Sequence, residues 1–228
     1  APMIKYRTAI RDRMGAMPPF YVEPAIGIQE FKNDHPLSDE ELAKIQAWVD
    51  NGVPQGDLAD MPPPLDFPAD RGWVLGEPDL VLRGPDMTVP AVGPDRWGDI
   101  GLVPTGLTED RYVQSVEVRE INDLPTDAEV ATVGGRYIFH HMTYSSGALN
   151  EDGTGIVEET RQGWPIHEVG RNADIFGEGV GMLLPANSAL HLRASHVHST
   201  GWRETTGYLE FGYKFFPKGY EPKYMRSG

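Results

Sequence analysis

The sequence predicts a mainly β protein, an antiparallel β-sandwich or jelly roll preceded by a small α-helical segment. Residues 1–60 carry the patterns of helices. From about residue 73 onward, short runs of β-branched and aromatic residues alternate with connections rich in Gly, Pro and Asn. Because no strong helical pattern separates those runs, antiparallel pairing in packed sheets is favoured over a parallel sheet with crossover helices.

The clearest helix signal lies in the stretch HPLSDEELAKIQAWVDNG, residues 35–52. Ser38 and Glu41 have the spacing of a capping box, which supplies acceptors to the free N–H groups of a first helical turn. Gly52 suits the C-terminal end of that helix. A second, shorter helix is predicted across Ile4–Met14. The apolar residues of the first helix fall on one face: Leu42, Ile45, Trp48 and Val49.

A segment rich in Pro and Gly, VPQGDLADMPPPLDFPADRG, follows the helices. This composition excludes a helix and indicates a semi-rigid, extended connector. We therefore divide the chain into a helical segment of residues 1–58, a connector of residues 59–72 and a β domain of residues 73–228.

Five stretches of the β domain are predicted as strands: Asp79–Leu82, Arg111–Arg119, Arg136–Tyr144, Ala189–His198 and Tyr208–Phe216. The tryptophans of this region are expected to pack the core and its rims, since aromatic burial dominates such cores: Trp73, Trp97, Trp164 and Trp202.

The charge and cysteine counts narrow the range of partners and cofactors. The formal net charge is −14, with 34 acidic against 20 basic residues, which argues against a nucleic-acid partner. An acidic surface suits a cationic protein or a metal ion instead. The absence of cysteine removes disulfides, thiolate metal ligands and thioether-linked haem. The longest apolar runs are only a few residues, so no membrane-spanning segment is predicted.

Five of the seven histidines fall in two predicted strands. In the later strand, Leu190, Leu192, His196 and His198 share one face by the period-two rule, and its apolar start suggests that this face looks inward. An H-x-H pair on one strand face gives a metal ion two imidazoles. A third imidazole from a neighbouring strand would complete a site for copper or zinc.

That third imidazole has two adjacent candidates, His140 and His141, in the earlier strand. Neighbouring side chains on a strand point to opposite faces, so both can reach one ion only if the backbone twists or bulges there. Copper is favoured over zinc if redox chemistry is involved. Spacing alone leaves a structural role for these histidines equally open. His35 and His167 are expected to be structural.

Three stretches carry a resemblance to a known family: YIFHHMTY, LLPANSALHLRASHVHSTG and YLEFGYKFFPKGYEPKY. They resemble bacterial relatives of the copper type II, ascorbate-dependent monooxygenases, whose best-known member is peptidylglycine α-hydroxylating monooxygenase. The resemblance covers roughly residues 73–228. It implies a jelly-roll domain that holds one copper ion, with His140 and His141 matching an adjacent ligand pair and His198 matching the third ligand. His196 has no clear counterpart, and it is expected beside the ligands or as an alternative ligand.

The stretch AMPPFYVEP, together with the helix of residues 35–52, resembles the C-terminal half of a small c-type cytochrome. That resemblance makes Met17 the counterpart of an axial haem ligand. The sequence has no C-x-x-C-H motif, so haem cannot be attached covalently in the usual way. We therefore expect a haemless remnant in which Met17 is an ordinary packing residue.

Hydroxylases of this family use a second copper domain with an H-x-H pair and a methionine ligand. The sequence continues for only four residues after Tyr224, and Met225 is a poor ligand candidate there. We therefore expect a non-catalytic accessory subunit of a periplasmic electron-transfer membrane complex, respiratory or photosynthetic, that retains one copper site. Its partners would be protein subunits of that complex, a cytochrome among them. The alternatives are the electron-transfer-copper half of an ascorbate-dependent monooxygenase and a periplasmic copper-binding protein.

Overall fold

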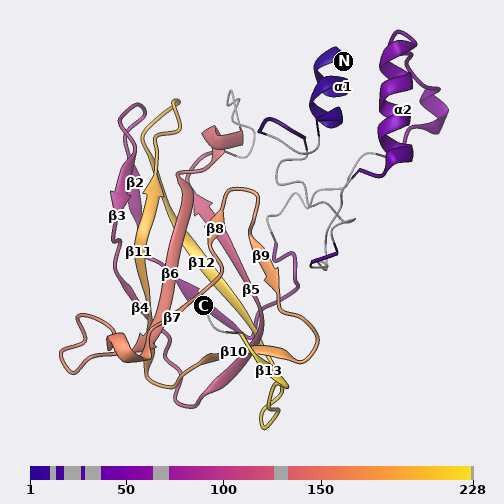
Figure 1. Ribbon diagram of the computed structural model, residues 1–228. Coiled ribbons are helices and arrows are strands. Elements are labelled where there is room, and N and C mark those ends of the chain that lie inside the picture. The colour runs from indigo at the N-terminus through magenta and orange to yellow at the C-terminus, as the bar shows by residue number, and fades with distance from the viewer. Residues whose placement is uncertain (11–13, 18–26, 29–36, 64–71, 126–132, 227–228) are drawn as a thin grey trace. The chain divides into compact units, whose positions relative to one another are not determined.

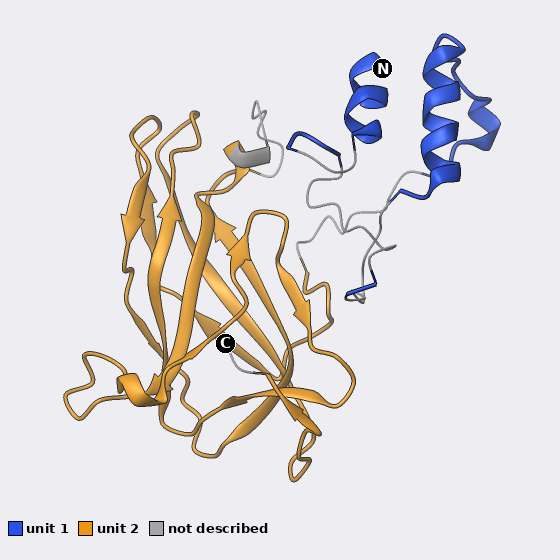
Figure 2. Cartoon of the chain, in the orientation of Figure 1, with its two compact units in different colours: residues 1–67 blue, residues 68–228 orange. Residues whose placement is uncertain are grey.

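The computed structural model describes residues 1–10, 14–17, 27–28, 37–63, 72–125 and 133–226. The chain divides into two compact units, Ala1–Phe67 and Pro68–Gly228 (Figure 2). The first unit carries the helices and the second carries the sheets. No helix within the described ranges is long and apolar enough to cross a membrane.

The predicted capping box is present at the start of α2 (Asp39–Asp50). The backbone N–H of Glu41 donates to Ser38 Oγ over 3.2 Å, and the Glu41 carboxylate accepts the backbone N–H of Ser38 at 2.8 Å. Helix α1 covers Pro2–Ala9 and not Ile4–Met14. Its earlier start follows from Pro2, whose fixed backbone angle and missing N–H suit a first helical turn.

One local element lies at the boundary between the predicted helical segment and the connector, where the sequence predicts none. A short 3₁₀ turn covers Leu58–Asp60, and the side chain of Asp57 caps it by accepting the backbone N–H of Ala59 at 2.9 Å. Three residues are enough for one turn, which is why Pro-rich surroundings do not prevent it. Residues 64–71 of the predicted connector and His35 lie outside the described residues.

The second unit is a β-sandwich of two sheets, as the sequence predicts (Figure 1). The seven-stranded sheet has the order β1-β12-β5-β10-β13, with β2 also paired to β12 and β9 to β5. Its strands are β1 (Leu80–Arg83), β2 (Met87–Val89), β5 (Arg111–Asn122), β9 (Ala173–Ile175), β10 (Val180–Leu184), β12 (Thr205–Phe215) and β13 (Tyr224–Met225).

The six-stranded sheet has the order β3-β11-β6-β7, with β4 also paired to β11 and β8 to β6. Its strands are β3 (Arg96–Gly98), β4 (Leu102–Pro104), β6 (Phe139–Ala148), β7 (Gln162–Gly163), β8 (His167–Glu168) and β11 (Ser188–Val197). Figure 1 shows β3, β11, β6 and β8 next to one another in this sheet. All described strand pairs are antiparallel except β10 with β13.

The core lies between the two sheets. Tyr144 of β6 contacts Phe211 of β12, with ring centroids 5.0 Å apart, and Trp164 meets Tyr213 edge-on at 5.1 Å. These side chains are nearly inaccessible to solvent. Burying one large apolar side chain contributes about 1.5–3 kcal/mol, so the interlocked inner faces of the sheets hold the sandwich together.

Each of the five predicted strands is present, with end shifts of up to four residues, and the largest shifts are in β6. Strand β6 begins at Phe139 and not at Arg136, because Val133–Arg136 forms a 3₁₀ turn. It continues to Ala148, where the sequence predicts a connection. Its last residues are small or polar, yet they pair with the start of β11, which is buried. Pairing and burial therefore override the low strand propensity of that stretch.

Candidate metal centre

A β-bulge in β6 brings His140 and His141 to one face. In the ladder with β11, His141 pairs with His196, and Phe139 pairs with the residue after His196, so His140 is an extra residue without a pairing partner. Phe139 and Met142 both belong to the core, and the two histidines between them therefore lie on the outer face of the sheet. The β-bulge that two adjacent histidines need in order to reach one ion is therefore present.

A second register shift, between His191 and Ala194, reverses which side chains of β11 point toward the core. Leu190 before the shift and Val197 after it both belong to the core, so His196 lies on the outer face. The inward orientation predicted for the H-x-H pair is therefore wrong for His196. The period-two rule fails here because one extra residue in β11 moves every later side chain to the opposite face.

The two irregularities together produce a cluster of three imidazoles, His140, His141 and His196, whose ligand atoms lie within 4.8 Å of one another. The Nδ1 atom of His140 is 3.0 Å from Nδ1 of His196 and 3.2 Å from Nδ1 of His141. One imidazole nitrogen carries either one proton or one lone pair, so hydrogen bonding alone does not account well for both contacts.

A shared cation would bring imidazole nitrogens to similarly short distances. Two imidazole nitrogens bound to one ion at about 2.0–2.1 Å in tetrahedral geometry lie about 3.3–3.4 Å apart. The observed Nδ1 separations of 3.0 and 3.2 Å are slightly shorter than this, and all three ligand atoms lie within 4.8 Å of one another. The cluster could therefore hold a metal ion.

Asp95 orients one of the candidate ligands. Nε2 of His196 donates to Oδ2 of Asp95 over 2.8 Å. This bond places the ring proton on Nε2 and leaves the Nδ1 lone pair facing His140. A carboxylate that holds the far nitrogen of a metal-ligating histidine is a common support in metal sites, since it fixes both the tautomer and the ring orientation.

Comparison with known proteins adds no relative from which ligands could be transferred. No protein-family model, curated protein or solved structure matches this chain. The assignment of the candidate metal centre therefore rests on the positions of its own atoms.

Trp97 covers the cluster from the outside. It pairs with His196 in the ladder between β3 and β11, and its indole stacks on the His196 ring with centroids 4.0 Å apart and planes 7° apart. The same indole meets His141 edge-on at 4.8 Å. Trp97 is 63% exposed, so it is not the core or rim residue expected from the sequence. The short strand Arg96–Gly98 gave no alternating pattern that could have revealed this contact.

The cluster is buried on one side and open on the other. His196 is only 7% exposed beneath Trp97, His141 is half-buried, and His140 is exposed. Burial lowers the pKa of His141, and the neighbouring His196 and His140 lower it further. Both causes favour the neutral imidazole, which is the form that binds a metal. Access beside His140 leaves room for a further ligand from solvent or from another molecule.

His198 lies beside the cluster and not within it. Its ring centroid is 5.7 Å from that of His140 and 6.3 Å from that of His196. Its Nδ1 lies 3.0 Å from the carbonyl oxygen of Ser199, a distance at which an Nδ1–H donates to that oxygen. The structure thus groups His196 with the adjacent pair, whereas the resemblance implies His198 as the third ligand.

The remaining candidate residues lie elsewhere. His191 is 2.5 Å from a carboxylate oxygen of Asp99, and His167 is buried in β8. Met17 belongs to the helical unit and is 53% exposed, and Met225 is an exposed residue of β13 in the opposite sheet.

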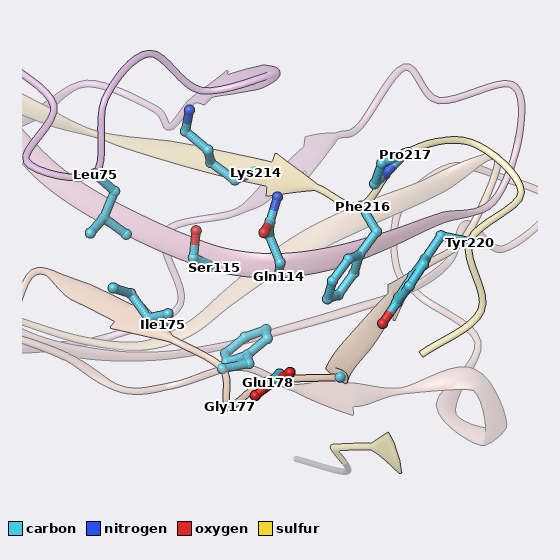
Figure 3. Close-up of a pocket in the computed structure, with 12 residues that line it drawn as sticks. Leu75, Gln114, Ser115, Ile175, Gly177, Glu178, Lys214, Phe216, Pro217 and Tyr220 are labelled. Atoms are coloured by element: carbon cyan, nitrogen blue, oxygen red, sulfur yellow. The ribbon is translucent and has the colours of Figure 1, made fainter. Parts of the chain in front are cut away.

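A concavity of about 610 Å³ opens on the seven-stranded sheet (Figure 3). Phe216 and Tyr220 stack along one wall with ring centroids 4.5 Å apart, and Ile175 and Glu178 belong to another. Its described lining residues include no histidine. The concavity and the candidate metal centre are therefore separate features.

Proposed function

We propose that the β-sandwich binds one copper ion through the Nδ1 atoms of His140, His141 and His196. The observation that carries this proposal is the convergence of the three imidazoles, with Nδ1 separations of 3.0 and 3.2 Å around His140. When bound, copper supplies one-electron transfer between Cu⁺ and Cu²⁺.

Copper fits this donor set better than other common metal ions. Carboxylate and carbonyl oxygens, which Mg²⁺ and Ca²⁺ prefer, are not among the grouped ligand atoms. Among divalent first-row metals, Cu²⁺ binds nitrogen donors most tightly. Zinc is the second candidate, since three imidazoles and an open position also form zinc sites.

The surrounding residues have separate roles in this proposal. Asp95 keeps the proton of His196 on Nε2, so that Nδ1 is available as a ligand. Trp97 excludes water from the His196 side of the cluster and holds two of the rings in place. His140 leaves one side of the cluster open to solvent.

We further propose that the chain is a non-catalytic accessory subunit of a periplasmic electron-transfer membrane complex. Its net charge of −14 supports association with a cationic protein surface. The exposed indole of Trp97, stacked on a candidate ligand, offers an apolar contact beside the metal centre. Co-purification with a membrane-bound cytochrome complex is the expected result. Copper- and ascorbate-dependent hydroxylation by the isolated protein would favour the monooxygenase alternative instead.

Metal titration tests the copper proposal directly. The metal-free protein is titrated with Cu²⁺ against a competing chelator, alongside His140→Ala, His141→Ala and His196→Ala. We expect one ion per chain. Removal of a residue that only supports a ligand costs roughly 10–100-fold in metal affinity, and each of these ligand variants should lose more than that.

Two further variants sharpen the test. His191→Ala removes a histidine outside the cluster and should bind Cu²⁺ like the unaltered protein. His198→Ala separates the ligand set of the structure from that of the resemblance. Loss of binding in His198→Ala with normal binding in His196→Ala would overturn the proposed ligand set.

A further inference from the structure

Glu120 connects the seven-stranded sheet to the strand that carries two of the proposed ligands. It lies near the end of β5 and is only 6% exposed. Its carboxylate accepts the backbone N–H of Ile138 at 2.8 and 3.1 Å and that of Phe139 at 2.9 Å. These two residues directly precede His140, so Glu120 fixes the backbone at the point where the bulge begins.

Neighbouring bonds hold the same segment from other directions. Asn122 donates to Glu120 over 2.6 Å and to the carbonyl oxygen of Arg136 over 2.8 Å. On the β11 side, the backbone N–H of His198 donates to the carbonyl oxygen of Ile138 at 3.0 Å. Both backbone groups of Ile138 are thus occupied, one by Glu120 of β5 and the other by His198, which directly follows β11.

A buried carboxylate at this place needs a reason, because an ionised side chain is unfavourable away from water. Burial raises the pKa of Glu120, whereas the bonds from Asn122, Ile138 and Phe139 lower it. A carboxylate offers two acceptor oxygens with two lone pairs each, which suits the N–H groups that converge here. The side-chain amide of a glutamine at position 120 would instead direct its own N–H group toward one of these N–H groups.

We propose that Glu120 is a positioning residue of the metal centre, which holds Ile138 and Phe139 so that the bulge directs His140 and His141 at one ion. This inference rests on the proposed copper site. The seven-stranded sheet, which carries Glu120, would thus help to shape a site whose proposed ligands all belong to the six-stranded sheet.

The chain offers a matched control in Glu117, three positions earlier on β5. Glu117 is 4% exposed and also accepts two backbone N–H groups, those of Val74 and Leu75, each at 2.9 Å. Like Glu120, it anchors a backbone segment through two N–H groups, but that segment carries no proposed ligand. Glu117→Gln therefore measures the general cost of weakening such an anchor.

The experiment compares Glu120→Gln and Glu117→Gln with the unaltered protein. Cu²⁺ affinity is measured by chelator competition, the ligand environment by electron paramagnetic resonance, and the fold by thermal unfolding. We expect Glu120→Gln to weaken Cu²⁺ binding about 10–100-fold and to change the resonance spectrum, as loss of a supporting contact does in metal sites. Glu117→Gln should keep both the affinity and the spectrum, even where its melting temperature falls.

Equal affinity and equal spectra in the two folded variants would overturn the inference. If the unaltered protein itself binds no Cu²⁺, the proposed copper site fails, which is a different result. Should Glu120→Gln not fold, Glu120→Asp carries the same test, because its shorter side chain withdraws the carboxylate from the backbone N–H groups of Ile138 and Phe139. Normal affinity and an unchanged spectrum in folded Glu120→Asp would then count against the role of Glu120.

Discussion

His167 in β8 is a buried imidazole, 4% exposed, whose Nδ1 has no hydrogen-bond partner among the described residues. Burial lowers its pKa from 6.5 to about 4. Above pH 6.5 the ring is neutral in both the folded and the unfolded chain, so it leaves the free energy of unfolding unchanged. As the pH falls from 6.5 toward 4, the unfolded chain takes up a proton that the folded chain resists, and the fold loses stability.

The size of this loss follows from the two pKa values. The difference between 6.5 and about 4 corresponds to about 3 kcal/mol, because each pKa unit is worth about 1.4 kcal/mol. The loss is complete near pH 4, where the folded chain also becomes protonated. Since small domains are stable by about 5–15 kcal/mol, one buried ring accounts for a sizeable part of the acid sensitivity.

Urea unfolding of the unaltered protein and of His167→Gln tests this reasoning. Both are followed by tryptophan fluorescence between about pH 7.5 and pH 4, with a chelator present so that no bound metal ion contributes to the stability. Glutamine is of similar size and stays neutral, so other titrating groups cancel in the comparison. We expect the stability advantage of the unaltered protein to shrink by about 3 kcal/mol across this range. An advantage that stays constant with pH would refute the assigned pKa.

Three further changes test the site and the core. Asp95→Asn should weaken Cu²⁺ binding about 10–100-fold, measured by chelator competition, because the His196 tautomer is no longer fixed. Unchanged affinity would contradict the role of Asp95 in orienting His196. Trp97→Phe should remove most of the fluorescence quenching that Cu²⁺ causes while binding persists, since the indole stacks 4.0 Å from the His196 ring; equal quenching in both proteins would show that another tryptophan reports the metal. Phe211→Ala should lower the free energy of unfolding by about 3–5 kcal/mol in urea, because this fully buried ring would leave a cavity; a loss below about 1 kcal/mol would mean that the core collapses around the gap.

The fold was accessible from the sequence because its signals are local. The capping box at Ser38 needs only neighbouring residues, and it is present. Strand β12 alternates apolar and polar residues and is placed within three residues at its start and one at its end. Short strands such as Arg96–Gly98 carry no such pattern, since their place is set by the strand that they pair with.

The candidate site was accessible only in part. Adjacent histidines on a strand can share a ligand role only where the strand has a bulge, and no residue pattern around His140 specifies a bulge. The extra residue in β11 likewise reverses the facing of His196, and only the pairing with β6 reveals it. Contacts of Trp97 and Asp95 with His196 join residues about one hundred positions apart, so no local pattern could predict them.

The bulge at His140 also bears on how such a site can arise and disappear. Deleting this single residue would restore regular pairing, with Phe139 and His141 opposite Val197 and His196 as they are now. The core residues on either side would keep their places. Two of the three convergent imidazoles would remain, and the sheet would lose only its irregularity. One codon therefore separates a sandwich with three convergent imidazoles from one with two, and the core on either side is the same in both.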